Sequence, residues 1–273
     1  TDMISNQIIQ TSIDELKAIT KVDIYVFDLD GIKVAATTED IEISREIITG
    51  FAASPADSQV VGGYHFLKVL DDSEVAYVLA SRSNNDDAYM VGKIAVSQIQ
   101  NLIIAYKERF DRNNFFQNLI LDNLLLVDIY NRAQKLHIEV EGPRIVYLVE
   151  TRLEKDSSGM ELLRSLFSSQ NGDYITAVDE KNIILIKAVE RDASPESLEL
   201  VANTIVDMMK SEAMLKVRVS YGTVVQELRE VSKSYKEATM AMDVGRIFYA
   251  EKNVIAYSTL GLSLIHISEP TRL

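Results

Sequence analysis

Residues 88–136 read AYMVGKIAVSQIQNLIIAYKERFDRNNFFQNLILDNLLLVDIYNRAQKL, and this stretch decides how the chain is organised. It contains no proline and one glycine, Gly92. Asp86 and Asp87 precede it, where an N-cap acceptor and a favourable charge for the helix dipole belong. Ten of its residues recur at heptad a and d spacing, which predicts one stripe along a long helix. They are Ile99, Leu102, Tyr106, Arg109, Asn113, Phe116, Ile120, Asn123, Val127 and Tyr130.

A stripe of this kind is suited to pairing with another helix, so we expect a homodimer. Its expected seam consists of Ile99, Leu102, Tyr106, Arg109, Asn113, Phe116 and Ile120. The polar members weaken such a seam and fix its register. Thirty helical residues span about 45 Å, the width of a small domain. We therefore interpret residues 88–127 as a helical connector between two domains, with a break near Asp122–Asn123. The alternative is an ordinary long helix packed on its own domain.

Composition narrows the class of protein. A chain of 273 residues suggests two domains, and 47% hydrophobic with 25% charged residues is typical of a globular protein. There is no cysteine and there are three histidines, so we expect no disulfide, metal site or cofactor. No apolar run is long enough for a membrane span and no signal segment opens the chain, which favours a cytoplasmic location without membrane contact. The net charge of −13 repels nucleic-acid backbones.

Residues 1–87 show the pattern of a small antiparallel sheet with helices. Alternating residues predict strands, and the Asp30-Gly31 pair predicts a hairpin turn. The expected strands are Val22–Leu29, Ile32–Ala36, Val60–Val69 and Val75–Ser81, with helices over Ile4–Ile19 and Ile41–Phe51. This order resembles a PAS- or GAF-like sensor domain. The resemblance implies helices on one face of the sheet and a ligand pocket between them.

Residues 128–261 predict a second α+β domain. Ser194 and Pro195 mark the start of one helix, as N-cap and first helical residue. After a short helix over 128–136, the expected strands are 144–150, 174–178, 183–189, 215–225 and 254–257, and the expected helices are 159–169, one from 195, and 227–249. The resulting β-α-β-β-α-β-α-β order is that of a nucleotide-cyclase-type sheet. The fold class of the whole chain is therefore α+β.

The end of this domain carries a family resemblance. Tyr235-Lys236-Glu237-Ala238, Ala241-Met242, Ala256-Tyr257 and Leu260-Gly261 resemble the segment that ends the GGDEF-like domain of the carbohydrate (sugar) diacid regulators. These regulators belong to the PucR-type bacterial transcription regulators. The resemblance implies a sensor domain, a degenerate GGDEF-like domain and a closing helix-turn-helix. It also implies a small organic acid or sugar diacid as ligand.

The hairpin turn of the second domain lacks the catalytic motif. An active diguanylate cyclase has Gly-Gly-Asp/Glu-Glu-Phe there, with glycines close to the substrate and carboxylates on Mg²⁺. This chain has Asp179-Glu180-Lys181-Asn182. We therefore expect no catalytic residues and no enzyme activity, with a structural or dimerisation role for the domain. For Ser220-Tyr221-Gly222 the resemblance implies a packing role.

Six residues of the first domain are candidates for ligand binding. Arginine suits bidentate pairing with a carboxylate, and aromatic or polar side chains could line the cleft. The candidates are Tyr25, Phe27, Thr37, Arg45, His65 and Arg82. Taken singly, residues of these types are more often ordinary surface or core residues than ligand contacts. Alternation puts Tyr25 and Phe27 on one face of their strand, but the sequence leaves open which face the helices cover.

The last residues break the family pattern. Leu262–Arg272 reads LSLIHISEPTR, which resembles the translation of a sequencing-library adaptor. We therefore expect residues 262–273 to be an artefact and the helix-turn-helix, the one part expected to contact DNA, to be missing. The alternative is a genuine apolar tail.

The sequence thus favours the ligand-sensing portion of a cytoplasmic transcription regulator that controls carbohydrate or organic-acid utilisation genes. Two alternatives stay open. One is a diguanylate-cyclase-type enzyme with an unusual turn, and the other is a stand-alone ligand-binding or dimerisation module.

Overall fold

The computed structural model describes residues 4–151, 158–167 and 171–261. The chain divides into two compact units, Thr1–Phe110 and Asp111–Leu273, and both mix helices with a sheet, as the α+β prediction requires. No helix within the described ranges is long and apolar enough to cross a membrane. The segment 262–273, expected to be an artefact, lies outside the described residues.

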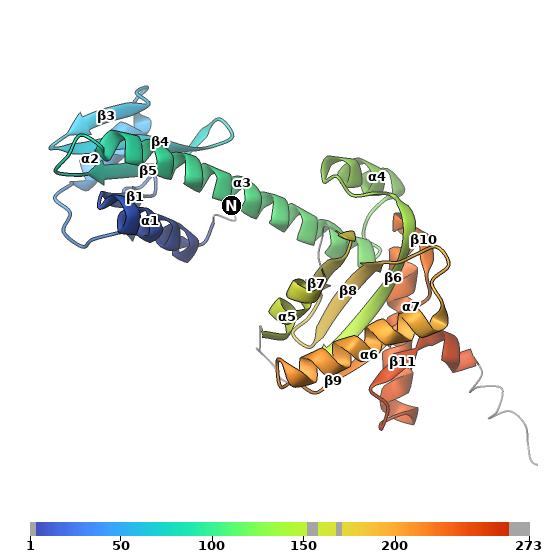
Figure 1. Cartoon of the computed structure of the whole chain (residues 1–273). Coiled ribbons are helices and arrows are strands. Elements are labelled where there is room, and N and C mark those ends of the chain that lie inside the picture. The colour runs from blue at the N-terminus through green and yellow to red at the C-terminus, as the bar shows by residue number, and fades with distance from the viewer. Residues whose placement is uncertain (1–3, 152–157, 168–170, 262–273) are drawn as a thin grey trace, which may run out of the picture. The chain divides into compact units, whose positions relative to one another are not determined.

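The first unit is built on a five-stranded antiparallel sheet in the order β2-β1-β5-β4-β3 (Figure 1). An antiparallel sheet was expected for residues 1–87, and the structure confirms it. Its strands are β1 (Asp23–Phe27), β2 (Lys33–Ala36), β3 (Ser58–Val61), β4 (Tyr64–Asp71) and β5 (Glu74–Arg82). Its helices are α1 (Asn6–Thr20), α2 (Arg45–Ala53) and the first part of α3 (Ala88–Ile120).

Helices cover both faces of this sheet, which corrects the expectation of helices on one face. Ile24 and Val26 of β1 join the core formed with α1 and α3. Tyr25 and Phe27 of the same strand join a second core formed with α2. Successive side chains of a strand point to opposite faces, and here both sets are large and apolar. A helix must therefore pack against each face of the sheet to bury these side chains.

Helix α3 lies close to the first sheet because of Gly92. A Cβ atom at this position would come within 2.7 Å of side-chain atoms of both Leu67 and Ser81. The buried Ser81 hydroxyl also donates a 2.6 Å hydrogen bond to the carbonyl of Ala88, at the start of the helix. These contacts join the end of β5 to the first turn of α3.

Helix α3 runs without interruption for 33 residues, and the boundary between the two units falls inside it. It ends at Ile120, just before the expected break, and Asp122 has a left-handed φ of 61°. Val127 and Tyr130 then belong to a separate helix, α4 (Leu126–Lys135).

The second unit has a six-stranded sheet with a main path β11-β9-β6-β8-β7, and β10 pairs with β6 (Figure 1). The expected order of elements is confirmed, with one expected strand divided in two. The strands are β6 (Glu141–Thr151), β7 (Tyr174–Ala177), β8 (Asn182–Ala188), β9 (Val217–Tyr221), β10 (Val225–Glu227) and β11 (Val254–Ala256). The helices are α4, α5 (Ser158–Leu166), α6 (Pro195–Ser211) and α7 (Val231–Phe248).

Gly222 separates β9 from β10, which were expected as one strand over 215–225. A Cβ atom at Gly222 would lie 2.2 Å from the carbonyl oxygen of Ser234 on α7, so only glycine fits this approach. Around it, the Ser234 hydroxyl accepts from the Val146 N–H at 3.0 Å and donates to the Thr223 carbonyl at 2.8 Å. The Ser220 hydroxyl donates to the Ala238 carbonyl at 2.7 Å. The contacts of Ser220 and Gly222 are thus packing contacts between sheet and helix.

Two cores enclose the second sheet. Val146 and Leu148 of β6 pack with the end of α3, α4 and α7, whereas Tyr147 and Val149 pack with α5 and α6. Helix α6 begins as expected at Pro195, with Ser194 as its cap, and the Ser194 hydroxyl accepts from the Ser197 N–H at 3.1 Å.

Candidate functional site

Three of the six candidate ligand residues meet on the α2 face of the first sheet. Tyr25 and Phe27 are buried there at 2% and 3% exposure, beside Tyr64. The rings of Tyr25 and Tyr64 meet edge to face at 5.8 Å. Arg82, at the end of β5, stacks on the Tyr64 ring at 5.1 Å and donates a 3.0 Å hydrogen bond to its hydroxyl. We call Tyr25, Phe27, Tyr64 and Arg82 the aromatic–arginine cluster.

The electrostatics of this cluster favour a neutral phenol beside a cation. Burial, followed by the neighbouring Tyr64, raises the pKa of Tyr25 to about 12. The Tyr25 hydroxyl therefore stays protonated and donates to the carbonyl of Asp40 at 2.9 Å. The hydrogen bond with Tyr64 raises the pKa of Arg82 above its usual value. The cluster thus offers one permanent positive charge at the edge of a buried aromatic core.

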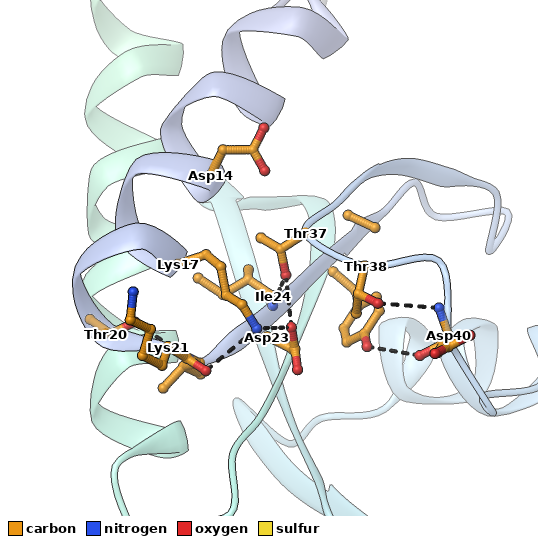
Figure 2. A network of polar contacts seen from close by, with 12 residues as sticks. Asp14, Lys17, Thr20, Lys21, Asp23, Ile24, Thr37, Thr38 and Asp40 are labelled. Carbon is orange, nitrogen blue, oxygen red and sulfur yellow. Dashed lines mark hydrogen bonds and ion pairs between the residues drawn. The ribbon is translucent and has the colours of Figure 1, made fainter.

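The other three candidates lie elsewhere. Arg45 donates from Nε to the carbonyl of Asp30 and so ties α2 to the β1–β2 turn. The Thr37 hydroxyl accepts from the Ile24 N–H at 3.0 Å and donates to Asp23, which also pairs with Lys17; Figure 2 shows this network. These contacts explain Arg45 and Thr37 as structural residues.

His65 is on the opposite face of the sheet from the cluster. Its ring lies 5.9 Å from that of Tyr89 on α3. Strand alternation gives the reason, because Tyr64 and Phe66 on either side of it both point toward α2. His65 is therefore not part of the site that Tyr25 and Arg82 form.

Tyr64 is the residue that the sequence reasoning missed. It hydrogen-bonds to Arg82 of the adjacent strand β5, and its ring contacts that of Tyr25 on β1, on the other side of β5. The alternation Tyr64, Phe66 on β4, matching Tyr25, Phe27 on β1, was a signal for a shared aromatic face. The signal becomes decisive only when both strands are known to pair with β5.

The hairpin turn between β7 and β8 uses its own acidic residue to close the turn. One oxygen of the Asp179 carboxylate accepts 2.8 Å hydrogen bonds from the N–H groups of Lys181 and Asn182, and the other accepts from the Asn182 amide at 2.8 Å. Burial opposes ionisation of Asp179, but these hydrogen bonds outweigh it and hold its pKa below the usual value. Within the described ranges, no three acidic or histidine side chains gather to form a metal site.

The expected helix seam is divided between the two cores of its own chain. Ile99 is fully buried in the first core, with Leu102 and Tyr106 packed against that core. Phe116 and Ile120 are buried in the second core at 5% and 0% exposure. Of the seven expected seam positions, only Arg109 is exposed. Most of the stripe is therefore buried within one chain, and the expected pairing of α3 with the helix of a second copy stays a prediction.

Asn113 contacts β7 of its own unit. Its side-chain oxygen accepts from the Thr176 hydroxyl at 2.9 Å and from the Tyr174 hydroxyl at 3.4 Å. One turn further on, Phe116 stacks on Tyr174 at 4.0 Å between ring centroids, and the Gln117 amide donates to the carbonyl of Ala177 at 2.7 Å. These contacts fix the position of α3 along β7, the strand that leads into the Asp179 turn.

Comparisons with known proteins identify the second unit. Residues 123–244 match the family described as the GGDEF-like domain, so the chain contains such a domain. A solved structure of PelD from Pseudomonas aeruginosa PAO1 aligns with 91% of this chain and 91% of that chain, at 12% identity and a TM-score of 0.28. No curated protein matches the chain.

Proposed function

We propose that this chain is the ligand-sensing portion of a cytoplasmic transcription regulator of the PucR-type sugar diacid regulator family. In this proposal the first unit binds a small organic acid or sugar diacid, and the GGDEF-like domain passes the response on without catalysis. DNA is contacted only through a helix-turn-helix outside this chain.

The observation that carries the proposal is the uninterrupted helix α3. It begins at the end of the sensor sheet and contributes buried residues first to one core and then to the other. A change at its first turn can therefore reach the GGDEF-like domain through a continuous hydrogen-bonded backbone.

The aromatic–arginine cluster is the proposed sensing site. A carboxylate can pair with the guanidinium of Arg82, which is one residue from Ser81, and Ser81 holds the first turn of α3 through its bond to Ala88. Ligand that draws Arg82 away from Tyr64 would thus act directly on the β5–α3 junction. This route requires a ligand that binds one conformation more tightly than the other.

The geometry of the hairpin turn supports a domain without cyclase activity. The Asp179 carboxylate accepts hydrogen bonds from the N–H groups of Lys181 and Asn182 in its own turn. The turn also has no glycine that would let a nucleotide approach its backbone closely. Incubation with GTP and Mg²⁺ tests this part of the proposal. Cyclic dinucleotide formation that disappears in Asp179→Ala would replace the proposal with a cyclase.

The sensing site is tested by titrating the purified chain with D-glucarate, a sugar diacid, in a calorimeter. We expect saturable binding that weakens at least tenfold in Arg82→Met, because a charge-assisted hydrogen-bond pair is lost. Arg109→Met is the matched control, since Arg109 is an exposed arginine of α3 outside the cluster. Equal affinity of wild type and Arg82→Met for every sugar diacid bound would refute the assignment.

A further inference from the structure

The GGDEF-like domain contains a cavity of about 490 Å³ at the ends of β7 and β8 that lie away from their connecting turn. Its walls come from the second half of α3, the α4–β6 loop, the start of β6, the residues before β7 and the end of β8. Pockets of about 300–1,000 Å³ are typical of small-molecule sites. The proposed sensing cluster lies in the other unit, so this cavity is separate from it.

A buried arginine lines the cavity without a carboxylate partner. Arg144, at the start of β6, is 7% exposed. Its guanidinium donates to the carbonyls of Glu139 and Gly142, and it forms no ion pair with an acidic side chain of the described residues. Burial lowers the pKa of Arg144, and the nearby Glu139 charge opposes this. A buried charge whose direct hydrogen-bond partners are all neutral carbonyls is costly, so an anion bonded to it would be stabilised.

The other charged groups at the cavity include a second arginine and an acidic side chain that is already paired. Arg112 on α3 also lines the cavity and donates to the Leu136 carbonyl at 2.9 Å. Asp173 is buried, but Lys187 pairs with it at 3.2 Å and the Ala188 N–H donates to it at 3.0 Å. His137, Glu139 and Tyr174 complete the titratable lining of the cavity. Asp173 is thus paired with Lys187, whereas Glu139 lacks a cationic partner within 4.0 Å among the described residues.

The remaining wall is apolar. Phe116 and Tyr174, which stack on each other at 4.0 Å, both line the cavity, as do Pro143 and Val189. A ligand that fits both parts of the lining needs an anionic group and a compact apolar body. An inorganic anion would use only the arginine side.

We propose that this cavity is a second ligand site, specific for a small organic carboxylate whose anionic group pairs with Arg144 and whose apolar body lies against Phe116 and Tyr174. The site goes beyond the proposed sensor function and does not depend on it. Because Arg112 and Phe116 belong to α3, and Tyr174 belongs to β7, the ligand would bridge the helix and the strand that Asn113 already joins. A ligand bound in this cavity would then strengthen the packing of α3 against β7 of the GGDEF-like domain.

The competing explanation is that Arg144 only clamps the two loop carbonyls. Arg218 offers a matched control for that role, because its guanidinium likewise donates to two loop carbonyls, those of Ala250 and Lys252, outside this cavity. Ala188→Leu offers an independent perturbation: Ala188 lines the cavity, so a larger side chain fills it while Arg144 stays in place.

The experiment is calorimetric titration of the whole chain with benzoate, with inorganic phosphate as a second probe. We expect saturable benzoate binding, at least tenfold weaker in both Arg144→Met and Ala188→Leu and unchanged in Arg218→Met. Phosphate should bind at least tenfold more weakly than benzoate. If Arg144→Met fails to fold, Ala188→Leu alone decides the result.

Three results with benzoate would overturn the proposal. They are the absence of saturable benzoate binding, binding that survives Ala188→Leu, and binding lost only in Arg82→Met, which would place benzoate in the sensor unit. Phosphate binding as tight as benzoate would show a plain anion site and would equally exclude the organic-carboxylate assignment. Failure here would leave the glucarate experiment on Arg82 unaffected.

Discussion

Replacing Asn113 separates two interpretations of the long helix, because they predict opposite signs. As a polar residue in a helix–helix seam, Asn113 would cost stability, and an apolar replacement would stabilise the protein. In the structure, its oxygen is the acceptor for the hydroxyl of Thr176, which is 1% exposed. Asn113→Ala leaves that hydroxyl buried without its acceptor. The structure therefore predicts a loss of stability.

The size of the loss follows from two terms. A buried polar group without its hydrogen-bond partner costs about 1–3 kcal/mol. Alanine is a better helix former than asparagine by up to about 0.7 kcal/mol, which offsets part of this. The net expectation is a destabilisation of about 0.3–2.3 kcal/mol, and at about 2–4 °C per kcal/mol for a domain of this size the melting temperature falls by about 1–9 °C.

Differential scanning calorimetry of the whole chain measures this loss. Asn101→Ala is the matched control, because Asn101 is an exposed asparagine of the same helix and its replacement should be neutral or slightly stabilising. Thr176→Val completes a double-mutant cycle, in which the cost of Asn113→Ala should shrink once the hydroxyl is gone. An Asn113→Ala protein as stable as wild type, or more stable, would refute the assignment of Asn113 to β7.

Three further predictions follow from single positions. Gly222→Ala should destabilise the protein by about 3 kcal/mol or more in urea unfolding, since its Cβ would overlap the Ser234 carbonyl. Gly50→Ala in helix α2 is the control: no atom lies within 4 Å of a Cβ at this position, so the replacement should stabilise the protein by about 0.5–1 kcal/mol. The pKa of Asp179 is lowered on folding, so its contribution is complete above the unfolded value, near 3.8, and is lost as the pH falls through the lower folded value. In Asp179→Asn this part of the acid destabilisation should vanish, and an unchanged slope of stability against pH below 4 would contradict the role of Asp179 in the turn. The chain has no cysteine, so Arg109→Cys introduces a single thiol at an exposed position of α3. We expect a disulfide-linked dimer to form, with a yield that changes when D-glucarate is added. A protein that stays monomeric at high concentration would exclude the dimer.

The order of elements in both units could be predicted from the sequence because it depends on local patterns. Alternation identified the strand around Tyr25, and the Ser194–Pro195 pair located the start of α6. The division of β9 from β10 could not be predicted in this way. It depends on how closely Gly222 approaches Ser234, and that distance exists only once α7 lies against the sheet.

The candidate site shows the same limit. Sequence alternation predicts that Tyr25 and Phe27 share a face of β1. Both faces of this strand are apolar, so the pattern does not indicate which of them α2 covers. Tyr64 entered the site only through the pairing of β1 and β4 with β5, and the same pairing placed His65 on the other side.

For the helix that organises the chain, the sequence by itself determined its length and the stripe from Ile99 to Ile120. Helical periodicity is a local property, so it states which side chains share a face. Only the tertiary structure decided what covers that face: Ile99 is buried by one sheet, whereas Phe116 and Ile120 are buried in the other unit. Asn113 meets Thr176, 63 residues away in the sequence, because burial depends on which surfaces the folded chain brings together, and no local pattern encodes that distance.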